Sequence, residues 1–244
     1  METRQSDQFL EEKSAAYEEE APKPIITISA ISFDFDLVTT DTSKSRADEI
    51  KVLLVKNKKP PRKSKEGKPA GFGLPTGQLE SKEGMLEALK RETRDESGCS
   101  VKKIVGKVFV INKRILVDGN PTPNEIHVFL IEASESLSRI REVDEIDGSV
   151  EPWIPLRQLF EMSFAQDRNG SSRNTNGIYF SHLLRLYNAI ESMVFHPEDL
   201  IDGAVIKKWL KPNRKHLKAA MTNLEKMGLL DNFLPDEPEE EIPV

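Results

Sequence analysis

The most constraining feature of the chain is the segment GQLESKEGMLEALKRETRDESG, which spans residues 77–98 and has a glycine at each end. Residues 83–97 have the spacing of a helix, and Gly98 stands where a helix commonly ends. Like charges on one helix face repel by roughly a few tenths of a kcal/mol per pair. Within residues 83–97, the basic residues compensate only part of the acidic charge; they are Lys90, Arg91 and Arg94. The acids therefore form either a solvated surface or a site for a cation.

The spacing of three acids is compatible with a cation site as well as with a solvated face. Glu92 and Glu96 are separated by four residues, which places them about 40° apart on a helix, and Asp95 lies within about 100° of Glu96. Leu86, Leu89 and Thr93 occupy an adjacent face that can pack on a sheet. Oxygen ligands of this kind suit Mg²⁺ or Mn²⁺, which usually retain waters and substrate phosphates.

The segment closely resembles the Nudix box, with no gap in the spacing. The matching positions are Gly77, Glu83, Arg91, Glu92, Thr93, Asp95, Glu96, Gly98 and Cys99. There are departures from the pattern. The family usually has an aliphatic residue where Thr93 stands and a glutamate where Asp95 stands. It also commonly has two glycines after a proline, whereas this chain has Pro75, Thr76 and Gly77.

The resemblance implies a metal-dependent pyrophosphohydrolase that cleaves a diphosphate linkage in a nucleoside diphosphate derivative by attack of water. It implies that Glu92 and Glu96 are the principal ligands of Mg²⁺ or Mn²⁺. Asp95 is then a weaker or water-mediated ligand, and the Gly77 carbonyl is a further one. Glu83 and Arg91 resemble the family's structural ion pair, which braces the loop against the helix. The resemblance also implies a nucleotide-derived small-molecule substrate and allows a homodimer, but it does not identify the nucleotide.

The general base differs among members of the family. It can be a box glutamate, here Glu92, or an acid from a loop that follows the later strands. The loop candidates are Glu142, Asp144 and Glu145, and we select Glu145.

Composition and charge bound the remaining possibilities. No apolar run approaches the roughly 20 residues of a membrane helix, and the acidic N-terminus is unlike a signal peptide, so we expect a cytoplasmic protein. The net charge is −6, but residues 1–22 contain seven acids and two bases, and residues 231–244 contain six acids and no base. We interpret both ends as disordered acidic tails. The body between them has a net charge of about +5, which is too mild to argue for nucleic acid and does not exclude it.

The order of elements predicts an α/β (α+β) fold, with a mixed β-sheet sandwiched between helices. Strands are expected at 25–40, 50–57, 101–115 and 124–133, with a turn region DGNPTP between the last two. Helices are expected at 83–97 and 175–195. In the second helix, apolar residues at positions 179, 180, 183, 184, 186, 187 and 190 form a broad apolar face. The predicted Nudix domain spans 23–195, and a C-terminal helical extension of two helices spans 196–230.

Several residues outside the box have alternative interpretations. The basic loop 58–68 is either solvated or contacts substrate phosphates or an RNA backbone. Cys99 is the only cysteine, which excludes an internal disulfide, and we expect its side chain to be buried. We expect packing roles, rather than ligand or stacking roles, for the remaining candidates: His127, His182, Trp153, Phe72 and Tyr179.

The C-terminal extension leaves a second function open. Its second helix is basic, and some Nudix-like regulators carry a DNA-binding domain after a ligand-sensing domain. The alternative is therefore a Nudix-fold binding module whose C-terminal helices contact DNA or protein. Candidate DNA contacts are Lys207, Lys208, Arg214 and Lys215. No wing strands are expected after Leu230, and the box retains nearly all of its acids, so the enzyme is favoured.

Overall fold

The computed structural model describes residues 23–35, 49–57, 71–134, 151–163 and 178–230. The acidic tails, the basic loop 58–68 and the general-base candidates Glu142, Asp144 and Glu145 lie outside these ranges. Among the described helices, none is long and apolar enough to cross a membrane.

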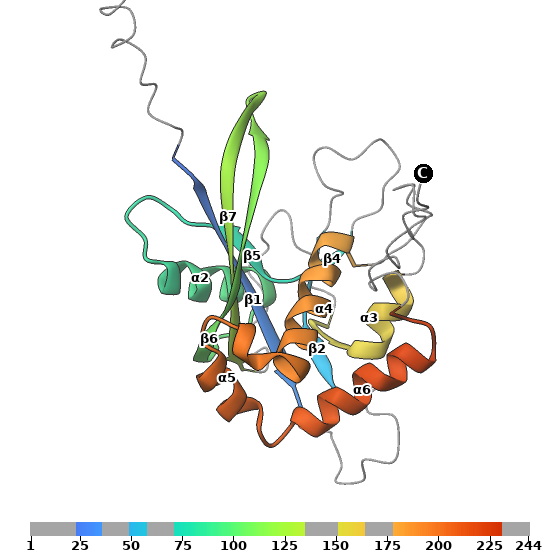
Figure 1. The fold of residues 1–244 in the computed structure, drawn as a ribbon. Helices are drawn as coiled ribbons and strands as arrows, with labels where there is room; N and C mark the ends of the chain where they lie inside the picture. Colours follow the sequence, from blue (N-terminus) through green and yellow to red (C-terminus); the bar gives the residue numbers. More distant parts are fainter. Residues whose placement is uncertain (1–22, 36–48, 58–70, 135–150, 164–177, 231–244) are drawn as a thin grey trace, which may run out of the picture.

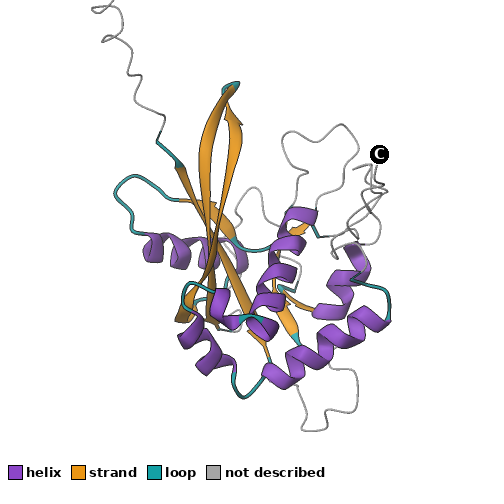
Figure 2. Cartoon of the chain, in the orientation of Figure 1, coloured by secondary structure: helices purple, strands orange, loops and turns teal. Residues whose placement is uncertain are grey.

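A mixed β-sheet forms the centre of the molecule, as the sequence predicts (Figures 1 and 2). Strand β1 lies parallel to β7 and antiparallel to β2 and β5, and the order along the sheet is β6-β7-β1-β2-β8. Strands β3 and β4 form a separate pair. The strands are β1 (Ile25–Asp34), β2 (Lys51–Leu53), β3 (Val55–Lys56), β4 (Phe72–Gly73), β5 (Thr76–Gln78), β6 (Val101–Val117), β7 (Asn120–Ala133) and β8 (Trp153–Pro155).

Helices cover both faces of this sheet. They are α2 (Met85–Ser97), α3 (Leu156–Ser163), α4 (Phe180–Phe195), the short 3₁₀ helix η1 (Pro197–Asp199), α5 (Gly203–Leu210) and α6 (Arg214–Lys226). In Figure 1, α2 lies on one side of β1 and α4 lies on the other. Alternation along β1 explains both layers, because successive strand residues point to opposite faces. Ile28 packs in the cluster with α2, whereas Ile31 belongs to the larger core with α4.

Strands β6 and β7 form a long hairpin that extends beyond the body of the molecule (Figure 1). The sequence suggests a turn region of six residues, but the actual turn is the pair Asp118 and Gly119, and β7 begins at Asn120. Both turn residues have positive φ, 50° at Asp118 and 85° at Gly119. Asp-Gly pairs favour this tight hairpin geometry, and it allows pairing to continue through Val117 and Asn120.

The C-terminal helices share the larger core with the sheet. Ile206 and Leu210 of α5 are buried in it, as are Leu217 and Leu224 of α6. The segment before α5 also pairs with the outer edge of β6. There the Asp202 N–H donates to the Lys107 carbonyl at 3.0 Å, and the Asp202 carboxylate accepts from the Lys107 N–H at 2.6 Å. A Cβ at Gly106 would lie 2.7 Å from that of Asp202, so the close approach requires glycine.

Candidate active site

Helix α2 begins two residues later than the sequence predicts. Gly84 is the N-cap residue, and its N–H donates to the Glu87 carboxylate at 3.0 Å. Gly98 ends the helix as predicted, with φ of 71° and its N–H bonded to the Arg94 carbonyl. The buried positions follow one another at intervals of four residues, with one adjacent pair at the start, and anchor α2 on the sheet. They are Ala88, Leu89, Thr93 and Ser97.

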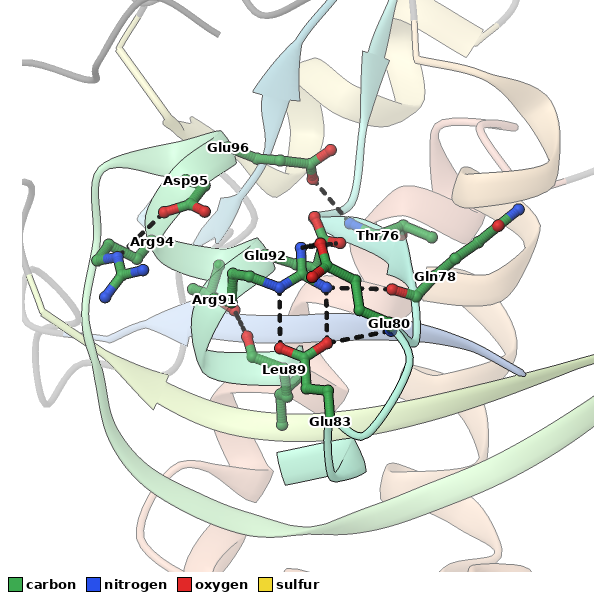
Figure 3. Close-up of polar contacts among 11 residues, drawn as sticks. Thr76, Gln78, Glu80, Glu83, Leu89, Arg91, Glu92, Arg94, Asp95 and Glu96 are labelled. Atoms are coloured by element: carbon green, nitrogen blue, oxygen red, sulfur yellow. Dashed lines mark hydrogen bonds and ion pairs between the residues drawn. The ribbon is translucent and has the colours of Figure 1, made fainter. Parts of the chain in front are cut away.

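Arg91 links α2 to the loop that precedes it. Its guanidinium donates to both carboxylate oxygens of Glu83, at 2.8 Å each, and to the Gln78 carbonyl at 3.1 Å (Figure 3). Glu83 also accepts from the Glu80 N–H at 3.2 Å. These bonds explain why Glu83 lies before the helix: its side chain closes the loop. Hydrogen bonding to Arg91 lowers the pKa of Glu83 and keeps it ionised.

Glu92 lies directly against Gly77 of β5. A Cβ built on Gly77 would stand only 1.8 Å from the Glu92 Oε1 atom and 2.4 Å from Oε2. The carboxylate therefore occupies the space that any other side chain at position 77 would fill. Arg91 donates to the Glu92 Oε1 atom at 2.7 Å. Burial raises the pKa of Glu92, and the hydrogen bond from Arg91 opposes that rise.

Glu96 is held one helical turn further along α2. Its Oε2 atom accepts the Thr76 N–H at 2.8 Å, so adjacent residues of β5 contact the two carboxylates (Figure 3). Asp95 is directed differently and accepts from Arg94 at 3.0 Å, where both side chains are largely exposed. The structure thus brings Glu92 and Glu96 to β5 and turns Asp95 toward Arg94.

The donor set fits a hard divalent cation. Within the described ranges, no cluster of three or more His, Cys, Asp or Glu side chains is arranged to hold a metal. Glu92 and Glu96 nevertheless place two carboxylates against adjacent residues of β5, Gly77 and Thr76. Mg²⁺ is commonly bound by one or two carboxylates, with waters and substrate phosphates completing its coordination. The two carboxylates are therefore sufficient as the protein's share of such a site.

Thr76 was not singled out by sequence reasoning. Its N–H positions Glu96, and its hydroxyl bonds the Leu74 carbonyl and the Ser29 hydroxyl, both at 2.9 Å. The sequence signal that could have indicated this role is the position of Thr76 directly before Gly77. A threonine at that position keeps a backbone donor and adds a side chain that ties β5 to β1.

The other candidates lie mainly in packed surroundings. His127 is buried in β7, and Phe72 and Cys99 are buried as well. His182 of α4 accepts the Leu74 N–H at Nδ1, at 3.0 Å, and Tyr179 accepts the Gly71 N–H. Trp153 is partly exposed in β8. The basic candidates for DNA contact lie on α5 and α6, and Arg214 donates to the Val194 carbonyl.

Comparisons with known proteins identify one family. The NUDIX domain model matches residues 37–174, which is more than half of the chain. No curated protein matches the chain. Among solved structures, the MutT NUDIX hydrolase from Burkholderia pseudomallei is similar, with 17% identity and a TM-score of 0.40 over 68% of this chain and 97% of that one. A MutT/nudix family protein from Enterococcus faecalis has 15% identity and a TM-score of 0.45 over 96% and 90% of the two chains.

Proposed function

The chain belongs to the Nudix family of hydrolases, and from this premise we propose that it is a metal-dependent pyrophosphohydrolase. It cleaves a diphosphate linkage in a nucleoside diphosphate derivative, with water as the nucleophile. The observation that carries this proposal is the convergence of Glu92 and Glu96 on adjacent residues of β5. Two carboxylates that converge on one short strand provide the negative charge and the oxygen ligands that a divalent cation requires.

The proposed roles follow from these contacts. Glu92 and Glu96 are the principal metal ligands, the Gly77 carbonyl is a further one, and Asp95 acts through water. When bound, Mg²⁺ or Mn²⁺ would supply positive charge to the diphosphate oxygens and favour deprotonation of the attacking water. The ion pair of Arg91 and Glu83 holds the preceding loop against α2, and the hydrogen bond from Arg91 fixes the direction of the Glu92 carboxylate.

The general base has two candidates. Burial raises the pKa of Glu92, which moves this carboxyl toward the range in which it can accept a proton near neutral pH. Glu145 remains the proposed alternative from the loop, and it lies outside the described residues. Replacing each by glutamine and measuring the pH profile of kcat separates them, because only the base's loss removes the acidic limb of that profile.

The test is turnover of a panel of nucleotide derivatives by wild type and by Glu96→Gln. The panel contains nucleoside triphosphates, dinucleoside polyphosphates, ADP-ribose, nicotinamide dinucleotides, coenzyme A and capped RNA, each with Mg²⁺ or Mn²⁺. We expect metal-dependent release of a nucleotide from at least one compound, and its loss in Glu96→Gln without a change in folding. Glu87→Gln is the matched control, because Glu87 is an exposed acid at the other end of α2.

Two outcomes contradict the proposal. Full activity in Glu96→Gln removes the site assignment. The absence of turnover across the panel, together with a melting temperature raised by one of the compounds, favours a ligand-sensing module instead.

A further inference from the structure

A polar patch interrupts the sheet face that lies under α4. Toward one end of β1 and β7, this face is apolar and contributes Ile31, Val128 and Leu130 to the larger core. Toward the other end, three buried polar side chains take their place: Thr27, Ser29 and Asn124. Thr27 donates to the Asn124 side chain at 2.9 Å, and Ser29 bonds Thr76 at 2.9 Å. Buried polar groups need hydrogen-bonding partners. The change from apolar to polar side chains therefore marks the end of this face at which a further polar group can be accommodated.

Arg185 of α4 directs its charge into this patch. The side chain is only 5% exposed, and its Nη1 atom donates to the Ser29 hydroxyl at 3.2 Å. Within the described part of the chain, no carboxylate forms an ion pair with it. Burial lowers the pKa of Arg185 to about 10, so the guanidinium is still charged at neutral pH. A buried cation without a counter-ion is unusual, because buried charges are normally paired.

The neighbouring titratable groups add positive charge rather than neutralising it. Lys113 stands opposite Asn124 in the β6–β7 ladder, and burial together with the nearby Arg185 lowers its pKa. Burial lowers the pKa of His182 to about 3, and the charges of Arg185 and Lys113 contribute to that shift. His182 is therefore neutral at physiological pH, and neither His182 nor Lys113 supplies a negative charge to Arg185.

Hydrogen bonds connect Arg185 to the proposed active site. Arg185 bonds Ser29, Ser29 bonds Thr76, and the Thr76 N–H bonds Glu96. Only two residues thus separate the guanidinium from a proposed metal ligand. A substrate held at Glu96 through one phosphate would have its adjoining groups beside this patch.

We propose that Arg185, with the Ser29 hydroxyl and Lys113, forms an anion subsite that binds a phosphate group of the substrate. This inference rests on the proposed function for the source of the phosphate. A guanidinium presents a rigid fork of N–H donors that matches two phosphate oxygens. Ser29 uses one of its donors, and among the described residues no other hydrogen bond of the guanidinium is seen, which leaves further donors for the ligand. The ligand supplies the counter-charge that none of the described residues provides at this position.

The experiment is isothermal titration calorimetry of the full chain with inorganic pyrophosphate in the presence of EDTA. Removing metal ions isolates the subsite from the proposed metal centre. We expect wild type to bind, Arg185→Gln to weaken binding at least tenfold, and Arg185→Lys to give an intermediate loss because it keeps the charge without the fork. Arg157→Gln is the matched control, since Arg157 is an arginine of α3 that pairs with Glu161 at the surface.

Thermal melting distinguishes the subsite from a structural role. Pyrophosphate is expected to raise the melting temperature of wild type and not that of Arg185→Gln. If Arg185→Gln does not fold, Arg185→Lys carries the test: measurably weaker binding supports the subsite, and unchanged binding overturns it. Equal affinity in wild type and Arg185→Gln also overturns it. So does the absence of detectable binding to wild type at about 10 mM pyrophosphate, a concentration that would detect a site of millimolar affinity.

Glu96→Gln separates this inference from the proposed function. Under EDTA this variant is expected to bind pyrophosphate at least as tightly as wild type, although it does not turn over substrate. If the substrate panel shows no turnover while Arg185-dependent binding persists, the hydrolase proposal fails and the anion subsite stands. If turnover occurs but the affinity for pyrophosphate does not depend on Arg185, the subsite proposal fails and the hydrolase proposal stands.

Discussion

Replacing Gly77 by alanine tests the contact between β5 and the Glu92 carboxylate. The new Cβ would lie 1.8 Å from the Glu92 Oε1 atom, whereas ordinary contact begins at 3.4 Å. The oxygen must therefore move by at least about 1.6 Å, away from the position in which it bonds Arg91 at 2.7 Å. A misplacement of about 1 Å in a catalytic constellation can cost about 10²-fold in rate. We expect kcat to fall by about 10²-fold, which corresponds to about 2.7 kcal/mol of transition-state stabilisation.

Stability should change little in the same variant. The atoms that must move are the end of a flexible side chain, and Gly77 does not have a positive φ that would strain alanine. Replacing glycine by alanine also lowers the entropy of the unfolded chain, which stabilises by about 0.4–1 kcal/mol. This gain offsets the displaced hydrogen bond, so we expect the melting temperature to shift by less than about 4 °C, the equivalent of 1 kcal/mol at this size.

Gly84→Ala is the matched control. A Cβ at Gly84 would stand 3.5 Å from the Glu87 carboxylate, which is ordinary van der Waals contact. The measurements are steady-state turnover of the compound found in the panel and thermal melting of both variants. Gly77→Ala with unchanged kcat would refute the reasoning, because Glu92 would then be displaced without consequence. A collapse of its melting temperature would refute the claim that the contact serves the site rather than the fold.

Three further predictions concern stability. In the folded chain the pKa of His182 is lowered from 6.5 to about 3, so the unfolded chain binds a proton at this residue first as the pH falls. The free energy of unfolding should therefore decrease by about 1–2 kcal/mol between pH 7 and pH 5. Urea unfolding of His182→Gln should show a weaker dependence of this free energy on pH, whereas the variant His196→Gln, at an exposed position, should not. Leu217→Ala should destabilise the whole domain by about 2–5 kcal/mol because Leu217 is fully buried in the shared core, whereas Met227→Ala, at an exposed position, should cost far less in the same urea titration. Thr93→Val removes a buried hydrogen bond to the Leu89 carbonyl while keeping the branched shape, so calorimetry should show a change within about 1.5 kcal/mol and a larger loss would contradict the packing role.

The box helix was predictable because its signals are local. The glycine after the helix, the apolar spacing and the positions of the acids all act within about twenty residues of chain. The two-residue error at its start has a local cause as well. Glu83 looks like a helical residue, but its carboxylate bonds Arg91 and the Glu80 N–H and thereby closes the loop.

Long-range consequences were not predictable in the same way. The pattern 179–190 assigned Leu184 to the apolar face and omitted Arg185, yet Leu184 is 36% exposed and Arg185 is buried. Periodicity alone cannot reveal this reversal, because Arg185 is drawn inward by Ser29, which is 156 residues away in sequence. The break between β2 and β3 at Leu54 is likewise set by a distant partner, since the Leu54 N–H bonds the Pro152 carbonyl.

The pairing of Asp202 with the edge of β6 has a consequence for biosynthesis. As the ribosome extends the chain, β6 and β7 are complete at Ala133, about seventy residues before Asp202. Until that segment arrives, the backbone groups of Lys107 are uncovered at the edge of the sheet. Uncovered strand edges are templates for aggregation, and chaperones commonly shield such intermediates. The segment before α5 therefore covers, late in synthesis, the edge of a sheet that is synthesised earlier.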